Sequence, residues 1–200
     1  MANTKNITIK NFLVPLAISA TVLSVLFISP NPNSPTPVAG AAAVDYFLKI
    51  EGVTGESTDP TYPSTIEIDS FSWGLSNSGS MASGGGGGSG KVSFQDLHFT
   101  MKRIDKSSPQ LRQALAQGQH FPKATLFVRK TGGNPEEFYK VALSDVVVSS
   151  YQSSASGGDV PKDNFSLNFT KIEFEYKPQS QAGTTGDAIK FSWDLKKSTK

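Results

Sequence analysis

The sequence predicts a mainly β fold, a sandwich or barrel, with one short helix. Short runs rich in aromatic and β-branched residues recur from Val44 onward, and clusters of Gly, Ser, Asp, Asn and Pro separate them. This alternation is typical of all-β domains, in which tight turns join short strands. Only the segment after Ser107 shows the helical spacing of apolar residues. The length of 200 residues predicts one compact domain.

The amino terminus differs from the rest of the chain. Two lysines precede an uncharged, mostly apolar run over residues 12–29, and a Pro-rich spacer and several small residues follow. This order is typical of a cleaved export signal. An uncleaved membrane anchor is the alternative, because a run of about 18 apolar residues is close to the shortest that spans a bilayer. We therefore place residues 1–43 outside the fold and expect one domain over residues 44–200.

The composition argues against several classes of protein. The formal net charge of +2 comes wholly from the amino-terminal segment, so the predicted domain is neutral. Lys and Arg alternate with Asp and Glu along it, without the basic cluster that nucleic-acid binding requires. We expect no nucleic-acid partner. The chain has no cysteine, which excludes disulfides and thiolate metal sites.

The first predicted strand covers residues 46–50, and a polar loop over 52–63 leads to a second strand over 65–73. Apolar residues of the second strand change faces between Ile68 and Phe71. Either a β-bulge shifts the phase or both faces of this strand meet apolar surface, as at a contact between subunits.

A glycine-rich segment follows. Residues 76–90 include five consecutive glycines, which predicts a long loop without regular structure. A phosphate-binding loop has little support, because no Gly-Lys-Ser/Thr follows and the next segment has strand character. We expect a hairpin extension that becomes ordered on contact with a partner. The next strand, residues 92–101, changes parity near Gln95 and Asp96, which predicts another bulge.

The predicted helix begins at Ser107-Ser108-Pro109 and ends at Gly118. A serine cap, a proline at the first helical position and a glycine after the last turn are typical of helix ends. Four strands remain, and a Gly-Gly-Asn-Pro sequence predicts a hairpin turn between the first two of them. They cover residues 124–129, 138–148, 165–176 (with another change of parity) and 189–195.

Nothing in the sequence predicts an active site. Serines are abundant, but no Gly-x-Ser-x-Gly turn occurs, and the two histidines, His98 and His120, are isolated. We expect His98 to be solvated or hydrogen-bonded on its strand. Carboxylate pairs such as Glu67 with Asp69 have the spacing of a solvated strand face. We therefore expect no enzyme activity, no cofactor and no metal site.

Short segments spread over the whole predicted domain carry a family resemblance. They are Asp45 to Ile50, Ile66 to Ile68, Ser72 to Gly74, Ser76 to Met81 with the glycine run, Gln95 to Leu97, Ile104 to Pro109, Gly118 to Phe121, Val146 to Ser150, Leu167 to Phe169 and Tyr176 to Gln179. In this order they resemble the tube proteins of type VI secretion, the haemolysin co-regulated protein (Hcp) family. Because the match spans the domain, it is more specific than any single motif.

The resemblance implies a closed antiparallel β-barrel with one short α-helix that assembles as a hexameric ring, with rings stacked into a tube around an open lumen. It implies contacts with a spike protein and small effectors, which the tube carries. Ser70 and Ser72 are assigned to a lumen or interface strand. The contact loop between subunits or rings corresponds to Ser76, Asn77, Ser78, Gly79, Ser80, Met81, Gly84, Gly85, Gly86, Gly87, Gly88 and Gly90.

Two functions follow as expectations. The first is a structural tube subunit of a type VI secretion-like system that carries or chaperones effectors. The alternative is an exported β-barrel module that forms tubes or binds surfaces without contractile secretion, because family members do not usually begin with an export segment. Both predict a secreted protein, released through the signal or through the type VI apparatus. The alternative locations are the periplasm and the inner membrane, where only residues 12–29 would contact the bilayer.

Overall fold

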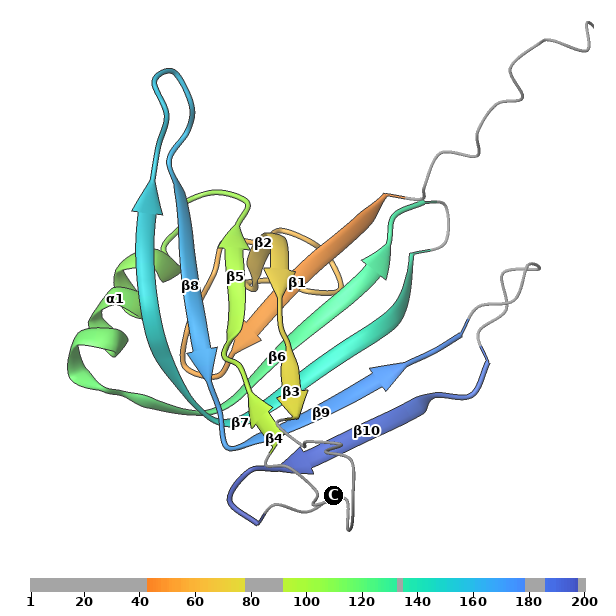
Figure 1. Cartoon of the computed structure of the whole chain (residues 1–200). Helices are drawn as coiled ribbons and strands as arrows, with labels where there is room; N and C mark the ends of the chain where they lie inside the picture. Colours follow the sequence, from red (N-terminus) through yellow and green to blue (C-terminus); the bar gives the residue numbers. More distant parts are fainter. Residues whose placement is uncertain (1–42, 78–91, 133–134, 179–185, 198–200) are drawn as a thin grey trace, which may run out of the picture. The chain divides into compact units, whose positions relative to one another are not determined.

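Six antiparallel strands close into a barrel in the computed structural model, which describes residues 43–77, 92–132, 135–178 and 186–197 (Figure 1). The barrel order is β7–β6–β1–β2–β5–β8, and β8 pairs back with β7. The expected closed β-barrel is thereby confirmed. Its strands are β1 (Val44–Ile50), β2 (Ile66–Ser72), β5 (Leu97–Met101), β6 (His120–Lys130), β7 (Glu136–Ser154) and β8 (Lys162–Asn168).

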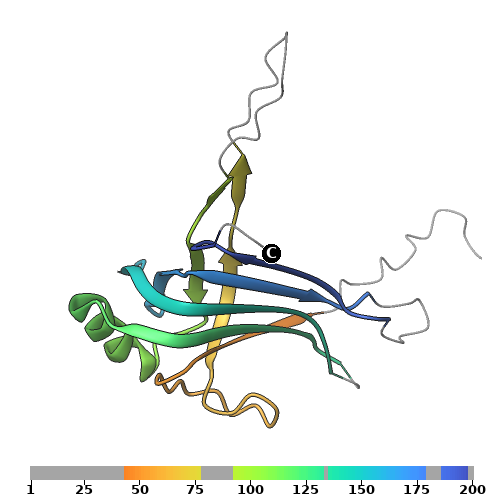
Figure 2. The same ribbon diagram turned by 90° about the horizontal axis from the view of Figure 1, so that it is seen from below.

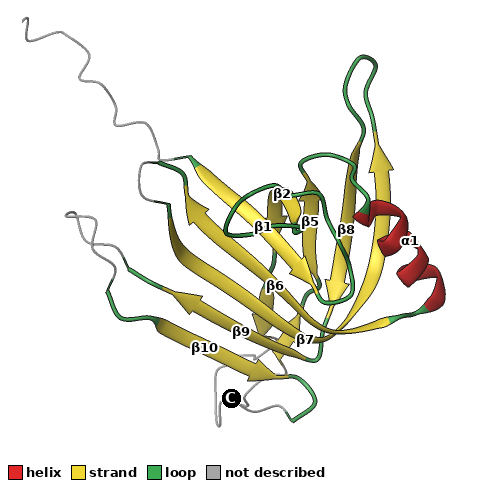
Figure 3. Ribbon diagram, turned by 180° about the vertical axis from the view of Figure 1, so that it is seen from behind, coloured by secondary structure: helices red, strands yellow, loops and turns green. Residues whose placement is uncertain are grey.

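Two smaller β elements and a helix complete the described part of the chain. β9 (Lys171–Tyr176) pairs with β7, and β10 (Ile189–Asp194) pairs with β9, so the sheet extends beyond the barrel. β3 (Leu75–Asn77) and β4 (Val92–Phe94) form a separate two-stranded sheet that leaves the barrel where β2 ends and β5 begins (Figure 2). Helix α1 (Ser107–Gln117) packs beside β7 (Figure 3).

β7 belongs to both the barrel and the extension. One edge pairs with β6, while the other edge pairs first with β9 and then with β8. The predicted single strand over 165–176 is therefore wrong. It breaks at Phe169 and Thr170, because β8 has β5 as its second partner whereas β9 has β10. The break lets the chain leave the barrel wall and explains the change of parity in the sequence.

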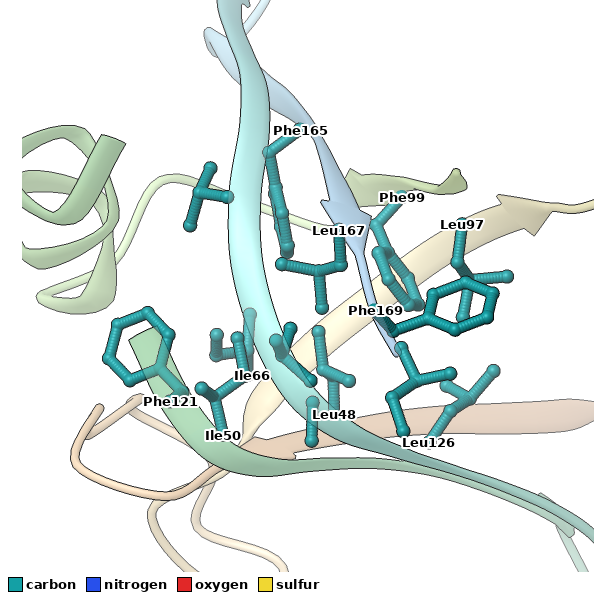
Figure 4. Close-up of a cluster of buried hydrophobic side chains, with 14 of the residues drawn as sticks. Leu48, Ile50, Ile66, Leu97, Phe99, Phe121, Leu126, Phe165, Leu167 and Phe169 are labelled. Carbon is teal, nitrogen blue, oxygen red and sulfur yellow. The ribbon is translucent and has the colours of Figure 1, made fainter. Parts of the chain in front are cut away.

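The barrel interior is a continuous apolar core. The inward residues of β1, such as Leu48 and Ile50, meet Ile66 of β2 and Leu126 of β6 (Figure 4). Phe99 of β5 stacks on Phe165 of β8 with ring centroids 5.3 Å apart. Full burial of side chains of this size contributes about 1.5–3 kcal/mol each, so the core is the main source of stability.

A bulge in β2 resolves the parity of the second predicted strand. The register between β2 and β5 shifts between Ile68 and Ser70, so that Phe71 lies opposite the buried Phe99. The apolar residues on both sides of the bulge thus face the interior, and the bulge hypothesis is confirmed in place of a subunit contact. A bulge within one strand was predicted near Gln95, and this prediction is wrong. The chain there forms two separate strands, β4 and β5.

The helix begins at Ser107, two residues before Pro109, which the sequence predicts at the first helical position. The N-cap position is Lys106, without a side-chain cap, and Asp105 accepts the Ser107 amide hydrogen at 2.7 Å. Asp105 therefore provides the capping oxygen that the sequence assigned to serine. Ser108 is instead buried against β8, where its hydroxyl donates to Asp163. The glycine end is confirmed, with Gly118 in the left-handed region at φ 61°.

The loop between β1 and β2 covers the outer face of β1 and β6. Tyr62 lies between Phe47 and Phe127, with ring centroids 4.9 and 4.8 Å away. Arg129 packs over Phe47 and forms two hydrogen bonds with Asp59. Apolar residues on both faces of β1 are therefore buried by other parts of the same chain, without a neighbouring subunit.

A search of the described residues for a helix able to cross a membrane finds none. The apolar run at 12–29 lies outside those residues, so the expected signal or anchor stays a prediction.

Candidate functional site

The outer wall of the barrel opposite β1 and β6 carries a polar groove with a volume of about 300 Å³. It includes Ser70 and Ser72, the two residues that the sequence assigned to a lumen or interface strand, and both are exposed. We call it the hydroxyl groove. Its lining residues are Ser70, Phe71, Ser72, His98, Phe99, Thr100, Ser150, Gln152, Asn164, Phe165 and Ser166.

Strand register explains why these polar side chains share one face. Ser72 lies opposite His98, which lies opposite Ser166. Ser70, Thr100 and Asn164 form the next row across the same strands. Side chains alternate along a strand, so the phenylalanines between the rows face the core while the rows face outward. The bulge in β2 is what brings both serines to the outer face.

Short hydrogen bonds hold the groove side chains in place. The Thr100 hydroxyl donates to Oδ1 of Asn164 at 2.7 Å. The Ser150 hydroxyl lies 2.7 Å from Oγ of Ser166, which lies 2.6 Å from Nδ1 of His98. The expectation of a hydrogen-bonded His98 is thereby confirmed. These contacts fix the donors and acceptors that the groove presents to a ligand.

The groove geometry favours binding over catalysis. Ser166 is the serine in contact with histidine, but it is only 2 % exposed and therefore poorly placed to attack a substrate. No carboxylate lines the groove to orient the imidazole, as a triad requires. Hydroxyl, amide and imidazole groups in this pattern can instead exchange hydrogen bonds with a polar chain.

Charged groups lie at the ends of the groove and are already paired. Asn168 donates to Asp96 at 2.7 Å at one end. The Lys162 ammonium lies 2.7 Å from Asp69 at the other. The middle of the groove is therefore polar but nearly free of fixed charge.

One face of β9 and β10 is charged, unlike the hydroxyl groove. Glu175 lies within 4 Å of the ammonium groups of Lys140, Lys177 and Lys190. Partial burial raises the pKa of Glu175, but the three lysines outweigh this effect and hold it below its ordinary value. This face therefore carries several ion pairs, whereas the hydroxyl groove carries none in its middle.

Only two residues of the predicted contact loop fall within the described chain. Ser76 and Asn77 lie in β3, opposite Ser93 and Val92 of β4, so the prediction that regular structure is absent is wrong at this end of the loop. The rest of the loop, residues 78–90, lies outside the described residues. What the structure adds is a β-hairpin base from which the glycine run continues.

An aromatic cluster anchors this hairpin base and was not predicted from the sequence. Trp73 contacts Phe94 of β4 and Phe174 of β9, with centroid separations of 6.1 and 4.9 Å. Trp193 of β10 stacks beside Phe94 at 6.0 Å. The clean alternation of the last strand was the available signal, but its partner could not be identified without the topology.

Beyond this cluster, the inner face of β9 and β10 becomes exposed. Ile189 is 64 % exposed, and Tyr176 and Phe191 beside it are also exposed. Leu75 of β3 is exposed as well. Tyr176, Ile189 and Phe191 are neighbours on the paired strands, and exposed apolar side chains grouped in this way are typical of surfaces that another protein covers.

Comparison with known proteins decides the family. The family model described as "Type VI secretion system effector, Hcp" matches residues 47–176, more than half of the chain. This chain belongs to the Hcp family. The Hcp relative "Protein hcp1" of Pseudomonas aeruginosa is 45% identical over 157 residues, covering 77% of this chain and 96% of its own length.

Solved Hcp structures agree with the fold. One described as a type six secretion system protein superposes with a TM-score of 0.74 at 36% identity, covering 78% of this chain and 99% of its own. Hcp1 from Salmonella typhimurium superposes with a TM-score of 0.64 at 32% identity, covering 78% and 98% of the two chains. The barrel and its extension are therefore the architecture of this family.

Membership confirms the principal prediction from the sequence. The chain is a type VI secretion tube or effector protein, and the alternative of an exported module unrelated to contractile secretion is not favoured. The comparisons do not test the roles assigned to individual residues. Those roles are argued below from the geometry.

Proposed function

We propose that the chain forms hexameric rings that stack into a tube, and that the hydroxyl groove lines the lumen. The observation that carries this assignment is the contrast between the two surfaces. The groove presents hydroxyl and amide groups from four strands with few charges, whereas ion pairs cover one face of β9 and β10, the face opposite their exposed apolar residues.

An uncharged hydroxyl surface suits a tube that carries effectors. Each hydrogen bond to such a surface contributes only about 0.5–1.5 kcal/mol net, because water competes for the same groups. Cargo bound through several such bonds is held and can still be released. Fixed charges would instead select one class of cargo and hold it more tightly.

We assign contacts between subunits or rings to the hairpin of β3 and β4 with its glycine run, and to the exposed apolar row on β9 and β10. Ordering five glycines costs backbone entropy, so this loop should be fixed by a partner and not by the isolated barrel. The partners in this proposal are other copies of the chain, small effectors and a spike protein.

Ring formation is tested by native mass spectrometry and electron microscopy of the purified chain. We expect hexamers and stacked rings. Shortening residues 79–89 to a tight turn should weaken stacking while circular dichroism still reports the β-barrel. Stacking equal to that of the unaltered chain would refute the role of the loop, and a persistent monomer would refute the ring.

The lumen assignment is tested with a single thiol, because the chain has no cysteine. Ser72→Cys places a thiol in the hydroxyl groove, and Thr58→Cys places the control on the loop that covers β1 and β6. In assembled tubes a bulky polymer maleimide should modify the groove thiol much more slowly than the control thiol. In dissociated subunits both should react. Equal rates in tubes would refute a lumen-facing groove.

We further propose that residues 1–43 are an export segment, removed before a mature domain that begins near Val44. This proposal rests on the order of lysines, apolar run and small residues. Amino-terminal sequencing of protein recovered from cells and medium checks it. A secreted protein that retains its first residues would contradict cleavage.

A further inference from the structure

We propose that His98 is a charge switch in the hydroxyl groove, by which a ring holds acidic polypeptide segments at low pH and releases them as the pH rises. The inference rests on the proposed function, because it concerns what the groove binds. It adds a class of ligand and a condition for its release.

The first observation is the isolation of His98 among uncharged groups. Of the eleven residues that line the groove, His98 is the only one with an ionisable side chain, and histidine is the residue type that proteins use as a charge switch near neutral pH. The others are serine, threonine, asparagine, glutamine and phenylalanine. Protonation of this one imidazole therefore changes the character of the whole groove from polar to cationic.

The second observation is that the hydroxyl chain accommodates both charge states. With neutral His98, Nδ1 accepts from the Ser166 hydroxyl, and Ser166 accepts from Ser150. With protonated His98, Nδ1–H donates to Oγ of Ser166, whose own hydrogen can turn to Ser150. Because hydroxyls rotate and both donate and accept, reversal leaves neither serine without a partner. The groove thus gains a charge without losing its packing.

The third observation is that Nε2 remains available. Nδ1 is engaged by Ser166, and no hydrogen bond or ion pair joins Nε2 to another described residue. His98 is exposed in the groove. A protonated imidazole held at one nitrogen therefore presents its other N–H to a ligand carboxylate in a fixed orientation, which strengthens a charge-assisted hydrogen bond.

The charged groups near His98 do not cancel this effect. Asp96, on the same strand, accepts from Asn168, and Asp69 of β2 is paired with Lys162 of β8. The groove residues contributed by β7 are Ser150 and Gln152, which carry no charge. No carboxylate among the described residues forms an ion pair with His98, so an acidic ligand would supply the missing partner.

The partner that fits is an extended polypeptide segment that carries Glu or Asp among small polar residues. Its amides and hydroxyls match the groove, and its carboxylates match protonated His98. A ring multiplies the effect, because each subunit contributes one His98, and a long segment that spans several subunits gains from each contact. Release on neutralisation then requires no change of fold.

The experiment uses the full chain and two fluorescent peptides. One alternates Glu with Ser, and its twin has Gln in place of Glu. Binding is followed by fluorescence anisotropy at about pH 5.5 and about pH 8, where Glu stays ionised while a histidine changes charge. His98→Gln keeps a hydrogen-bonding side chain that cannot be protonated. His120→Gln is the matched control, because His120 lies outside the groove and pairs with Asp145.

We expect the Glu peptide to bind the unaltered chain and His120→Gln at least about fivefold more tightly at the lower pH. His98→Gln should bind it equally at both values, and the Gln peptide should show no dependence on pH. An unchanged pH response in His98→Gln, the same response for the Gln peptide, or no binding of either peptide would overturn the proposal. Light scattering on the same samples reports ring formation separately. A failure to assemble therefore counts against the proposed function, whereas the pH dependence of peptide binding tests the role of His98.

Discussion

Replacing Asp163 by asparagine should destabilise the domain, because this carboxylate is buried at the junction of α1 with β7 and β8. Its side chain is 0 % exposed. Ser108 of α1 donates to Oδ2 at 2.6 Å, and the hydroxyls of Tyr151 and Ser153 also donate to the carboxylate. The Arg112 guanidinium lies 3.3 Å from Oδ1. Four donors thus converge on two oxygens.

The expected cost follows from the donors that lose an acceptor. The substituted amide side chain would keep one oxygen and replace the other with an NH₂ group that faces donors. Two hydrogen bonds to a charged acceptor would be lost, at about 1.5 kcal/mol or more each, which gives a loss of about 3 kcal/mol. Urea unfolding at one protein concentration measures it, since assembly adds to apparent stability. Asp159→Asn, on the exposed connection between β7 and β8, is the control and should change stability by less than about 0.5 kcal/mol.

The same carboxylate predicts a pH dependence. Burial raises the pKa of Asp163, but the hydrogen bonds from Ser108, Ser153 and Tyr151, with the charge of Arg112, outweigh it and leave the pKa below its ordinary value. A lowered pKa stabilises the fold above the ordinary aspartate value of about 3.9 and loses this stabilisation as the pH falls through the lowered value. The difference between the unaltered chain and Asp163→Asn should therefore narrow in acid. A gap below about 1 kcal/mol at neutral pH, or one that does not vary with pH, would refute the reasoning.

Two further substitutions test the loop between β1 and β2. Gly55→Ala should lower the free energy of unfolding by about 2 kcal/mol in urea, because a Cβ there would lie 2.2 Å from the Thr65 carbonyl oxygen. Gly157→Ala is the control: a Cβ at Gly157 meets open space, so this change should be neutral. Equal losses of stability in the two variants would contradict the clash at Gly55. Arg129→Lys should lower the free energy of unfolding by about 1.5–3 kcal/mol and speed proteolysis of this loop, because lysine cannot reproduce the two hydrogen bonds to Asp59. An unchanged midpoint of urea unfolding together with an unchanged cleavage rate would contradict this reasoning.

Features governed by local rules were predictable from the sequence. Gly118 ends the helix because its left-handed backbone favours glycine, and this requirement is visible without any tertiary contact. The bulge between Ile68 and Ser70 could be inferred because strand periodicity fails at that point. The hairpin between β6 and β7 followed from its turn residues, and Lys130 does lie opposite Glu136.

Features that depend on distant partners were not predictable. The sequence could show a change of parity between Phe165 and Tyr176, but not that β5 and β10 take different halves of that segment. Tyr62 looked like part of a polar loop, because its stacking partners lie on β1 and β6. For the hydroxyl groove, Ser70 and Ser72 came from family resemblance, whereas the contact between Ser166 and His98 requires strand register.

The length of β7 has a mechanical consequence for a tube protein of type VI secretion. Its 19 residues run from the hairpin near α1 to the extension that carries β9 and β10, with two irregularities: Asp145 has a left-handed φ of 51°, and the register with β8 shifts between Val148 and Ser150. A load applied to the extension therefore reaches the barrel along one strand and through the rows of hydrogen bonds that this strand forms with its neighbours. Such bonds must break together instead of one by one. The two regular stretches of β7, on either side of Asp145 and the register shift, should therefore each move under force as a stiff unit.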